Sequence, residues 1–152
     1  MAELSDLEAR IRVLEDREAI KELKYSYWYC IDRGLWDKIG DVFAEDAWAD
    51  FNPDFKFRGR DMIANFFRDA IAPAYSLCMH MGHNGKIALT SDTTATGLWE
   101  LDNYMVPLEG DAAWIGAYYE DEYVKVNGEW KIQSTIIVYK FNKPYDQAWA
   151  TK

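Results

Sequence analysis

The sequence is poor in the residues on which disulfide-rich and metal-binding proteins depend. Its 152 residues include two cysteines and two histidines. Cys30 and Cys78 lie in apolar stretches without C-x-x-C spacing, so we expect buried free thiols and no disulfide framework. His80 and His83 are three residues apart in a predicted strand, where they would face opposite sides and could not bind one metal together. The sequence therefore predicts no metal centre.

Basic charge, long apolar runs and nucleotide-binding glycine motifs are also missing. The formal net charge of −9 argues against a nucleic-acid partner, because lysine and arginine supply most contacts to phosphates. No apolar run of about 18 residues and no signal-peptide pattern occurs, so we expect no membrane partner and a cytoplasmic location. Nucleotide-binding and serine-hydrolase motifs do not occur either, and we predict a protein without a cofactor.

Aromatic residues, in contrast, are abundant. They make up 16% of the chain, with 7 tryptophans and 10 tyrosines. Indole and phenol groups carry polar tips that are costly to bury without a partner, so their number suggests a pocket as well as an ordinary core. The length suits one domain, which we place at residues 1–152.

The first half of the chain has helical periodicity. Apolar residues recur every three or four positions over 4–14 and again over 20–31, which predicts two consecutive helices. Ser5 and Glu8 have the spacing of a capping box for the first helix, and Gly34 is a stop for the second. A short third helix is predicted over 35–43. A fourth opens at Gly59 and ends before Pro73.

The second half of the chain is predicted to be a sheet. Short extended pieces over 47–58 are followed by four strands at about 76–90, 93–106, 112–126 and 129–141, which are rich in β-branched and aromatic residues. Asn127 and Gly128 predict a tight hairpin. Long consecutive strands favour a bent antiparallel meander with the helices on one side, which is an α+β fold.

Both faces of the last predicted strand are apolar. Its alternating positions form two sets, Ile132, Ile136 and Val138 on one face and Ile137, Tyr139 and Phe141 on the other. The helices and a pocket can cover one face, and a second copy of the chain is the simplest cover for the other. We therefore expect a homo-oligomer.

Three polar residues are candidates for chemistry. His80 is flanked by methionines and is either a hydrogen-bonded core residue or a general acid/base, because histidine titrates near neutral pH. Asp32 lies near the C-terminal end of a predicted helix, where the macrodipole disfavours a carboxylate. It is one of two things: a functional group that acts as a base or as the partner of a histidine, or a solvated acid paired with Arg33 or Lys38. Tyr27 is five positions earlier, so an ideal helix would place it about 140° away from Asp32.

The order of elements and several local stretches resemble a known superfamily. These stretches are residues 19–24, 27–32 with 36–37, 79–83 (Met-His-Met-Gly-His), 93–97 and 127–130. The chain resembles the nuclear transport factor 2-like superfamily, in its SnoaL-like branch. It is most similar there to the bile-acid 7α-dehydratase type, with scytalone dehydratase a more distant relative.

This resemblance implies a cone-shaped α+β barrel that forms dimers or trimers and uses no cofactor. The family's dehydratases use a tyrosine and an aspartate from the long N-terminal helix with a histidine from a strand, and these correspond to Tyr27, Asp32 and His80. A further pocket tyrosine of the bile-acid enzymes corresponds to Phe51, and a late-strand arginine to Tyr139. The pocket is therefore expected to be more apolar and the substrate different.

Together the residues and the resemblance predict a cofactor-free lyase of the dehydratase type, acting on a hydrophobic cyclic or aromatic small molecule in an enclosed pocket. His80 would be the base, Asp32 its orienting partner or the acid, and Tyr27 the donor to the substrate oxygen. The residues expected to bind the substrate are Trp28, Trp48, Phe51, Trp99, Tyr118 and Tyr139. Alternatives are a formaldehyde-releasing carbon–carbon lyase, an isomerase or cyclase, and a non-catalytic ligand-binding module.

Overall fold

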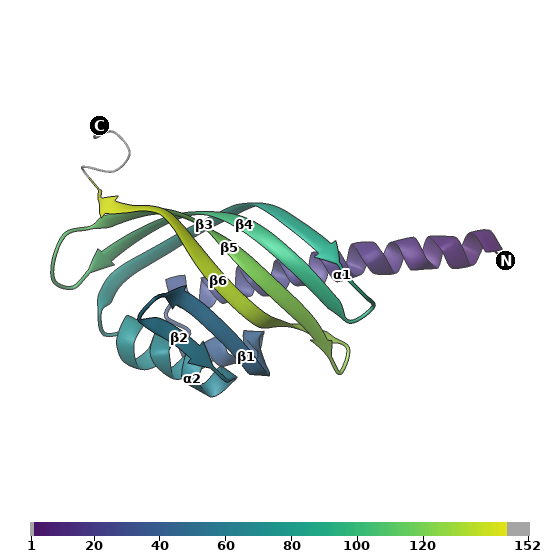
Figure 1. The fold of residues 1–152 in the computed structure, drawn as a ribbon, viewed down its shortest axis with the longest axis horizontal. Helices are drawn as coiled ribbons and strands as arrows, with labels where there is room; N and C mark the ends of the chain where they lie inside the picture. Colours follow the sequence, from purple (N-terminus) through teal and green to yellow (C-terminus); the bar gives the residue numbers. More distant parts are fainter. Residues whose placement is uncertain (1, 146–152) are drawn as a thin grey trace.

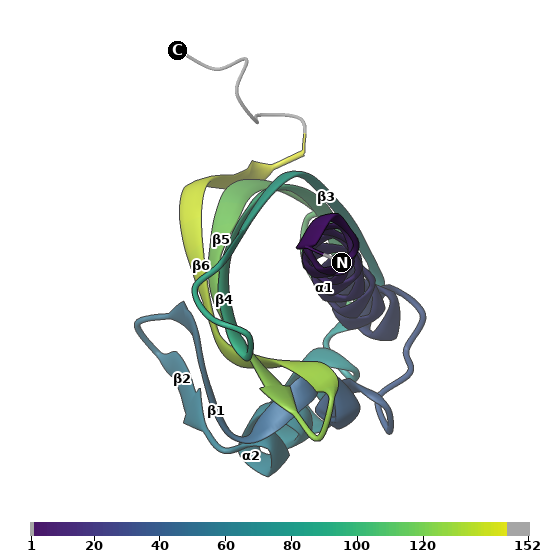
Figure 2. The same ribbon diagram turned by 90° about the vertical axis from the view of Figure 1, so that its right-hand side faces the viewer.

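A curled sheet wraps around one long helix (Figures 1 and 2). This arrangement comes from a computed structural model that describes residues 2–145. The predicted single domain at 1–152 includes residues outside that part and stays a prediction. The elements in chain order are α1 (Ala2–Asp32), the short 3₁₀ helix η1 (Ile39–Val42), β1 (Phe43–Asn52), β2 (Phe55–Arg58), α2 (Arg60–Phe66), the π-helical turn η2 (Phe67–Ile71), β3 (Tyr75–Leu89), β4 (Thr94–Pro107), β5 (Ala113–Val126) and β6 (Glu129–Pro144).

Helix α1 is continuous over 31 residues, so the prediction of two separate helices is wrong. Residues 15–19 contain no glycine or proline and consist mostly of good helix formers, so nothing breaks the backbone between the two apolar stretches. The capping-box spacing of Ser5 and Glu8 marks no boundary, because the helix already includes Ala2. The predicted stop is confirmed: Gly34 follows the helix with φ +65°, a conformation that favours glycine.

The predicted third helix over 35–43 is also wrong. Only Ile39–Val42 form a 3₁₀ turn, and Phe43 already belongs to β1, where it pairs with Ile132 of β6. The segment is too short to complete several α-helical turns, and pairing with the sheet takes its last residue. The predicted helix after Gly59 is present as α2 and continues as the π-helical turn η2.

The sheet has six strands in the order β2-β1-β6-β5-β4-β3 and is not closed. The antiparallel meander from β3 to β6 is confirmed. The hairpin at Asn127 and Gly128 is confirmed as well, with φ values of 52° and 87°. Strand β1 pairs in parallel with β6, a contact that local patterns do not predict. The result is the expected cone-shaped α+β fold.

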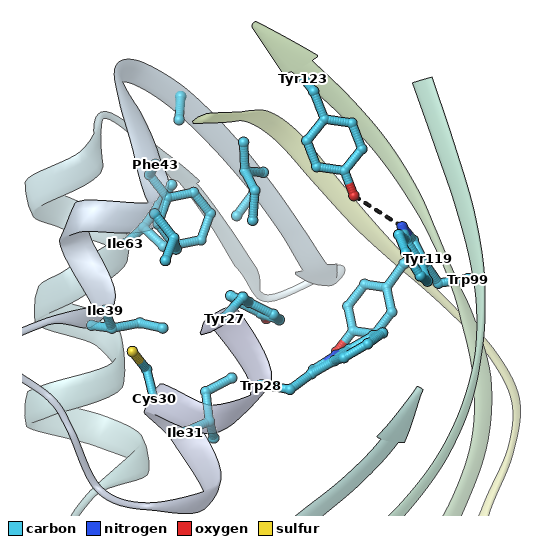
Figure 3. Close-up of a cluster of buried hydrophobic side chains, with 14 of the residues drawn as sticks. Tyr27, Trp28, Cys30, Ile31, Ile39, Phe43, Ile63, Trp99, Tyr119 and Tyr123 are labelled. Atoms are coloured by element: carbon cyan, nitrogen blue, oxygen red, sulfur yellow. Dashed lines mark hydrogen bonds between the residues drawn. The ribbon is translucent and has the colours of Figure 1, made fainter. Parts of the chain in front are cut away.

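The core lies between α1 and the concave face of the sheet (Figures 2 and 3). Tyr27 is at its centre, with its ring edge-on to the rings of Phe43, Phe67 and Tyr119 at centroid distances of 5.9 to 6.1 Å. These contacts position the last turns of α1 against the sheet. No helix within residues 2–145 combines the length and apolar character that a membrane crossing requires.

Candidate active site

The last residue of α1 contacts one residue of β3 twice. Asp32 Oδ1 lies 2.6 Å from Nδ1 of the His80 ring, and Asp32 Oδ2 accepts a hydrogen bond of 2.9 Å from the His80 backbone N–H. The His80 side chain is 7% exposed and that of Asp32 19%. Because the carboxylate contacts both the ring and the main chain of one residue, it orients the imidazole relative to its own strand.

The other ring nitrogen of His80 faces β4. Asn103 is the residue paired with His80 across the two strands, and its Nδ2 lies 3.3 Å from His80 Nε2. A carboxylate can only accept, so Nδ1 of a neutral ring carries the proton and Nε2 is an acceptor. Asn103 is 4% exposed, and among the described residues its Oδ1 has no hydrogen-bond partner. A buried acceptor of this kind calls for a donor beyond those that the described residues supply.

Both His80 and Asn103 line a cavity of about 200 Å³ at the end of the cone that α2 covers. Its lining combines aromatic and aliphatic side chains with a few polar groups: Tyr27, Ile31, Phe51, Asn52, Phe55, Phe66, Phe67, Ile71, Tyr75, His80, Asn103, Met105, Ile115, Tyr119, Ile137, Tyr139 and Asn142. A mostly apolar cavity with few convergent polar groups is the usual form of a small-molecule site.

Two buried phenols form the floor of this cavity. Burial raises the pKa of Tyr27 well above its ordinary value, and the nearby Tyr119 raises it further. Burial likewise raises the pKa of Tyr119. Both phenols therefore stay protonated over the physiological pH range and can act as hydrogen-bond donors.

Beneath the phenols lies a buried ion pair. Lys24 Nζ is 2.8 Å from Asp121 Oδ2, and both side chains are fully buried. The ammonium group also lies 3.6 Å from the centroid of the Tyr119 ring. Asp121 accepts further hydrogen bonds from the hydroxyls of Tyr123 and Thr135, both at 2.7 Å. Burial lowers the pKa of Lys24, whereas Asp121 opposes that change.

The structure brings some of the predicted site residues together at the cavity. Tyr27, Phe51, His80 and Tyr139 line it, while Asp32 lies behind the His80 ring and outside the lining. Burial raises the pKa of the Tyr139 phenol, which is still 42% exposed. The two histidines face opposite sides of β3, as strand periodicity predicts, and His83 is on the outer surface near Asp102.

Four predicted substrate contacts do not line this cavity. Trp28 packs against β3 at Gly82, and the Trp99 indole donates to Tyr123 within the core (Figure 3). Trp48 and Tyr118 belong to the outer face of the sheet, because their neighbours Ala47, Ala49, Ala117 and Tyr119 are buried on the inner face. Strand alternation therefore gives the inward position to Tyr119 in place of Tyr118.

Asn103 was missed for a related reason. It continues the inward series Trp99, Leu101 and Met105 of β4, so a polar residue at an apolar position was the available signal. Asn103 is 23 positions after His80, and its place beside that ring depends on the register of β4 against β3, which no local pattern specifies. Within residues 2–145, no three His, Cys, Asp or Glu side chains gather as metal ligands.

The open cone of six strands around a long helix, with a histidine at an interior cavity and a carboxylate behind it, defines a nuclear transport factor 2-like α+β protein. The chain belongs to the SnoaL-like domain family, which matches residues 12–136.

Solved structures with the same fold extend this comparison. A scytalone dehydratase-like protein from Novosphingobium aromaticivorans is 23% identical, with 90% of this chain and 91% of that chain covered and a TM-score of 0.83. A hexachlorocyclohexane dehydrochlorinase, LinA type 3 from Novosphingobium barchaimii, is 19% identical, with 89% and 93% covered and a TM-score of 0.83. A nuclear transport factor 2-like protein with a cystatin-like fold from N. aromaticivorans is 22% identical, with 90% of each chain covered and a TM-score of 0.76. At these identities the likeness concerns the fold.

Proposed function

We propose that this protein is a cofactor-free lyase that removes a proton and a small leaving group, such as water, from a hydrophobic cyclic molecule. The single observation that carries the proposal is the Asp32–His80 contact of 2.6 Å, with the other ring nitrogen of His80 at an apolar cavity. Fold relatives named as a dehydrochlorinase and a scytalone dehydratase-like protein support elimination as the reaction class.

His80 is the base in this proposal. Its Nε2 takes the proton from a substrate carbon, and the Asp32 carboxylate stabilises the imidazolium that forms. Asp32 acts through His80, because it does not line the cavity with the other polar groups. The electron pair of the broken C–H bond forms the new double bond as the leaving group departs, and the imidazolium can return its proton to a departing oxygen.

Tyr27 and Tyr119 are the donors to a substrate oxygen that gains negative charge. Both are buried, protonated and at the cavity floor. Preorganised donors in a site that excludes water stabilise an enolate or phenolate more strongly than water does. Asn103 Oδ1 is then an acceptor for a hydroxyl of the substrate, which supplies the donor that this buried oxygen lacks.

The cavity volume favours a small substrate. About 200 Å³ is below the range of about 300–1,000 Å³ that is typical of drug-sized ligands. Phe51, Phe66 and Phe67 form an aromatic wall, with ring centroids 5.4 to 5.5 Å apart. We therefore propose a compound of one or two rings that carries a carbonyl or phenol group and a neighbouring hydroxyl or halogen.

The test is a turnover assay with a panel of cyclic β-hydroxyketones and halogenated cyclohexanes, following the new double bond by absorbance or product mass. His80→Ala should lower kcat/KM by about a hundredfold or more, because it removes the proton-transfer group. His83→Ala is the matched control, because its ring is on the outer surface, and it should leave turnover unchanged. Full turnover by a folded His80→Ala variant would contradict the assignment of the base.

A second assay separates an enzyme from a non-catalytic binding module. A ring ketone without a leaving group can still lose its α-proton to His80, so the protein should catalyse exchange of that proton with D₂O. Asp32→Asn should slow the exchange, whereas binding of the ketone, followed by tryptophan fluorescence, should persist. Binding without exchange would favour the binding module, and release of formaldehyde from an aromatic diol would favour carbon–carbon cleavage.

A further inference from the structure

The N-terminal half of α1 extends beyond the sheet (Figure 1). Where the helix leaves the sheet, Asp16 is bound to the β5–β6 hairpin: Asp16 Oδ1 accepts hydrogen bonds from Lys125 Nζ at 2.5 Å and from Trp130 Nε1 at 2.9 Å. Lys125 also lies 5.0 Å from the Trp130 ring. This anchor fixes the direction of the preceding turns, whose side chains are exposed from Glu3 to Glu15.

The projecting part carries an unpaired apolar stripe. Its members are Leu4, Leu7, Ile11 and Leu14, which are 49% to 65% exposed. Single exposed leucines are common on protein surfaces, but a contiguous stripe on one helix face marks an interaction site. The spacing of three and four residues places Leu4 and Ile11 at the a positions and Leu7 and Leu14 at the d positions of two heptads.

The stripe does not belong to the protein's own core. Leu7 precedes the central core residue Tyr27 by 20 positions, which at 100° per residue places the two side chains about 160° apart around the helix. The stripe therefore faces away from the sheet, and the sheet of a second molecule would lie on the far side of a helix pair. Pairing through the stripe causes no steric conflict between the two sheets.

The charges beside the stripe favour one orientation of a pair. The e positions of the two heptads are both acidic, Glu8 and Glu15, and the g positions that follow them are both basic, Arg10 and Arg17. Antiparallel helices place e beside e and g beside g, so like charges would meet. In parallel helices, each g residue lies beside the e residue of the partner that is five positions later in sequence. Arg10 would therefore face Glu15 of the second copy.

The next g–e pair strengthens the same orientation. Arg17 would face Glu22 of the second copy, and both side chains are exposed in the single chain. Glu3 and Glu8 form the one like-charged pair, at the outer end of the helix. Ile11 at an a position with leucine at both d positions is the combination typical of two-stranded parallel coiled coils.

We propose that the stripe Leu4, Leu7, Ile11 and Leu14 is a docking surface for a second copy of this chain, which pairs with it as a parallel, in-register, two-helix coiled coil. Each residue of the stripe then lies beside its own equivalent. The pairing holds two cones on opposite sides of one helical stem and leaves both cavities free. It is independent of the proposed lyase activity.

Disulfide trapping tests the geometry. In a parallel pair, Leu7→Cys places two thiols beside each other, and mild oxidation should link most of the protein into covalent dimers. Val13→Cys is the matched control, because Val13 is exposed at a c position on the other side of the same helix. The unsubstituted chain, with Cys30 and Cys78, gives the background. Equal linkage of both variants, or of neither, would overturn the proposal.

Analytical ultracentrifugation tests the energetics in the full chain. Leu7→Glu combined with Leu14→Glu puts four carboxylates into the seam of a pair and should raise the dissociation constant by about a hundredfold or more. Val13→Glu adds the same group outside the seam and should associate like the unsubstituted protein. Circular dichroism and the thermal unfolding midpoint check that each variant is folded. Unchanged association of the folded double variant would overturn the proposal.

Discussion

Gly82 of β3 lies directly against the indole of Trp28 on α1. A Cβ atom built on Gly82 would be 1.9 Å from Cη2 of that ring, far inside any possible contact. The absence of a side chain therefore lets α1 approach β3 closely enough for Asp32, one helical turn after Trp28, to reach His80.

Replacing Gly82 with alanine should separate the helix from the strand. We expect a loss of about 1–3 kcal/mol in the free energy of unfolding, because the methyl group overpacks a full site. In the folded fraction, longer Asp32–His80 contacts should lower kcat. Gly40→Ala is the matched control, since its Cβ would meet Ala64 at an ordinary 3.5 Å. Urea unfolding and turnover measure both effects, and equal behaviour of the two variants would refute the prediction.

Replacing one member of the buried Lys24–Asp121 ion pair should cost more stability than replacing the other. Asp121→Asn leaves the Lys24 ammonium without a charged partner in the core, and we expect a loss of about 3–5 kcal/mol. Lys24→Met should cost less, because the Asp121 carboxylate keeps hydrogen bonds from Tyr123 and Thr135. Urea unfolding of both single variants and the double variant measures the coupling.

An exposed ion pair provides the comparison. Lys56 Nζ lies 2.8 Å from Asp50 Oδ2, but the lysine side chain is 60% exposed. Lys56→Met should change the free energy of unfolding by about 1 kcal/mol or less, because water screens the pair. If Asp121→Asn lowered the free energy of unfolding no more than Lys56→Met does, the buried pair would contribute no more to stability than the exposed pair.

Stability should fall in alkaline solution. Burial raises the pKa values of Tyr27, Tyr119 and Tyr123. The stabilisation is fully present below about pH 10, where the unfolded phenols ionise, and each phenol removes about 1.4 kcal/mol per pH unit above it. Burial lowers the pKa of Lys24, so this amine acts in the opposite direction, but only up to about pH 10.5, where the unfolded lysine loses its proton.

Urea unfolding between about pH 8 and about pH 11 measures this slope, and phenolate absorbance reports when the tyrosines ionise. The delayed phenols should ionise only as the protein unfolds. Tyr27→Phe removes one of them and should make the slope less steep. Stability that stays constant to the alkaline end would contradict the burial of these groups.

The sequence predicted the parts of the fold that short-range patterns specify. Strand periodicity and turn residues such as Asn127 and Gly128 located β3 to β6 within a few residues. Helix boundaries were less certain where no glycine or proline intervened, and the two apolar stretches of α1 looked like two helices. The parallel pairing of β1 with β6 depends on contacts distant in sequence, so no local pattern indicates it.

The candidate site divides in the same way. Residue type and the resemblance pointed to His80 and Asp32, yet helical periodicity separated Asp32 from Tyr27. The structure explains the separation: Tyr27 lines the cavity, whereas Asp32 contacts the His80 ring from outside it. The position of Asn103 beside His80 depends on the register of two strands. The choice of Tyr119 over Tyr118 as a cavity residue depends on which face of β5 turns inward.

The contact between Asn103 and His80 leads to a test of the proposed base that needs no known substrate. Asn103→Asp places a carboxylate beside His80 Nε2, where the amide nitrogen is now 3.3 Å away. A nearby negative charge stabilises the imidazolium, so the protonated form of the His80 ring should persist to higher pH in this variant than in the unsubstituted protein. NMR of the two imidazole C–H signals measures this, with His83 on the outer surface as the internal reference.

Asn103→Asp should also change how kcat/KM depends on pH. A base works only when unprotonated, so the acidic limb of the kcat/KM profile should move to higher pH together with the His80 signal. Asn103→Leu adds no charge and should raise KM, because the acceptor for the substrate hydroxyl is lost. If the NMR midpoint moved but the rate profile did not, His80 would titrate as described without being the base.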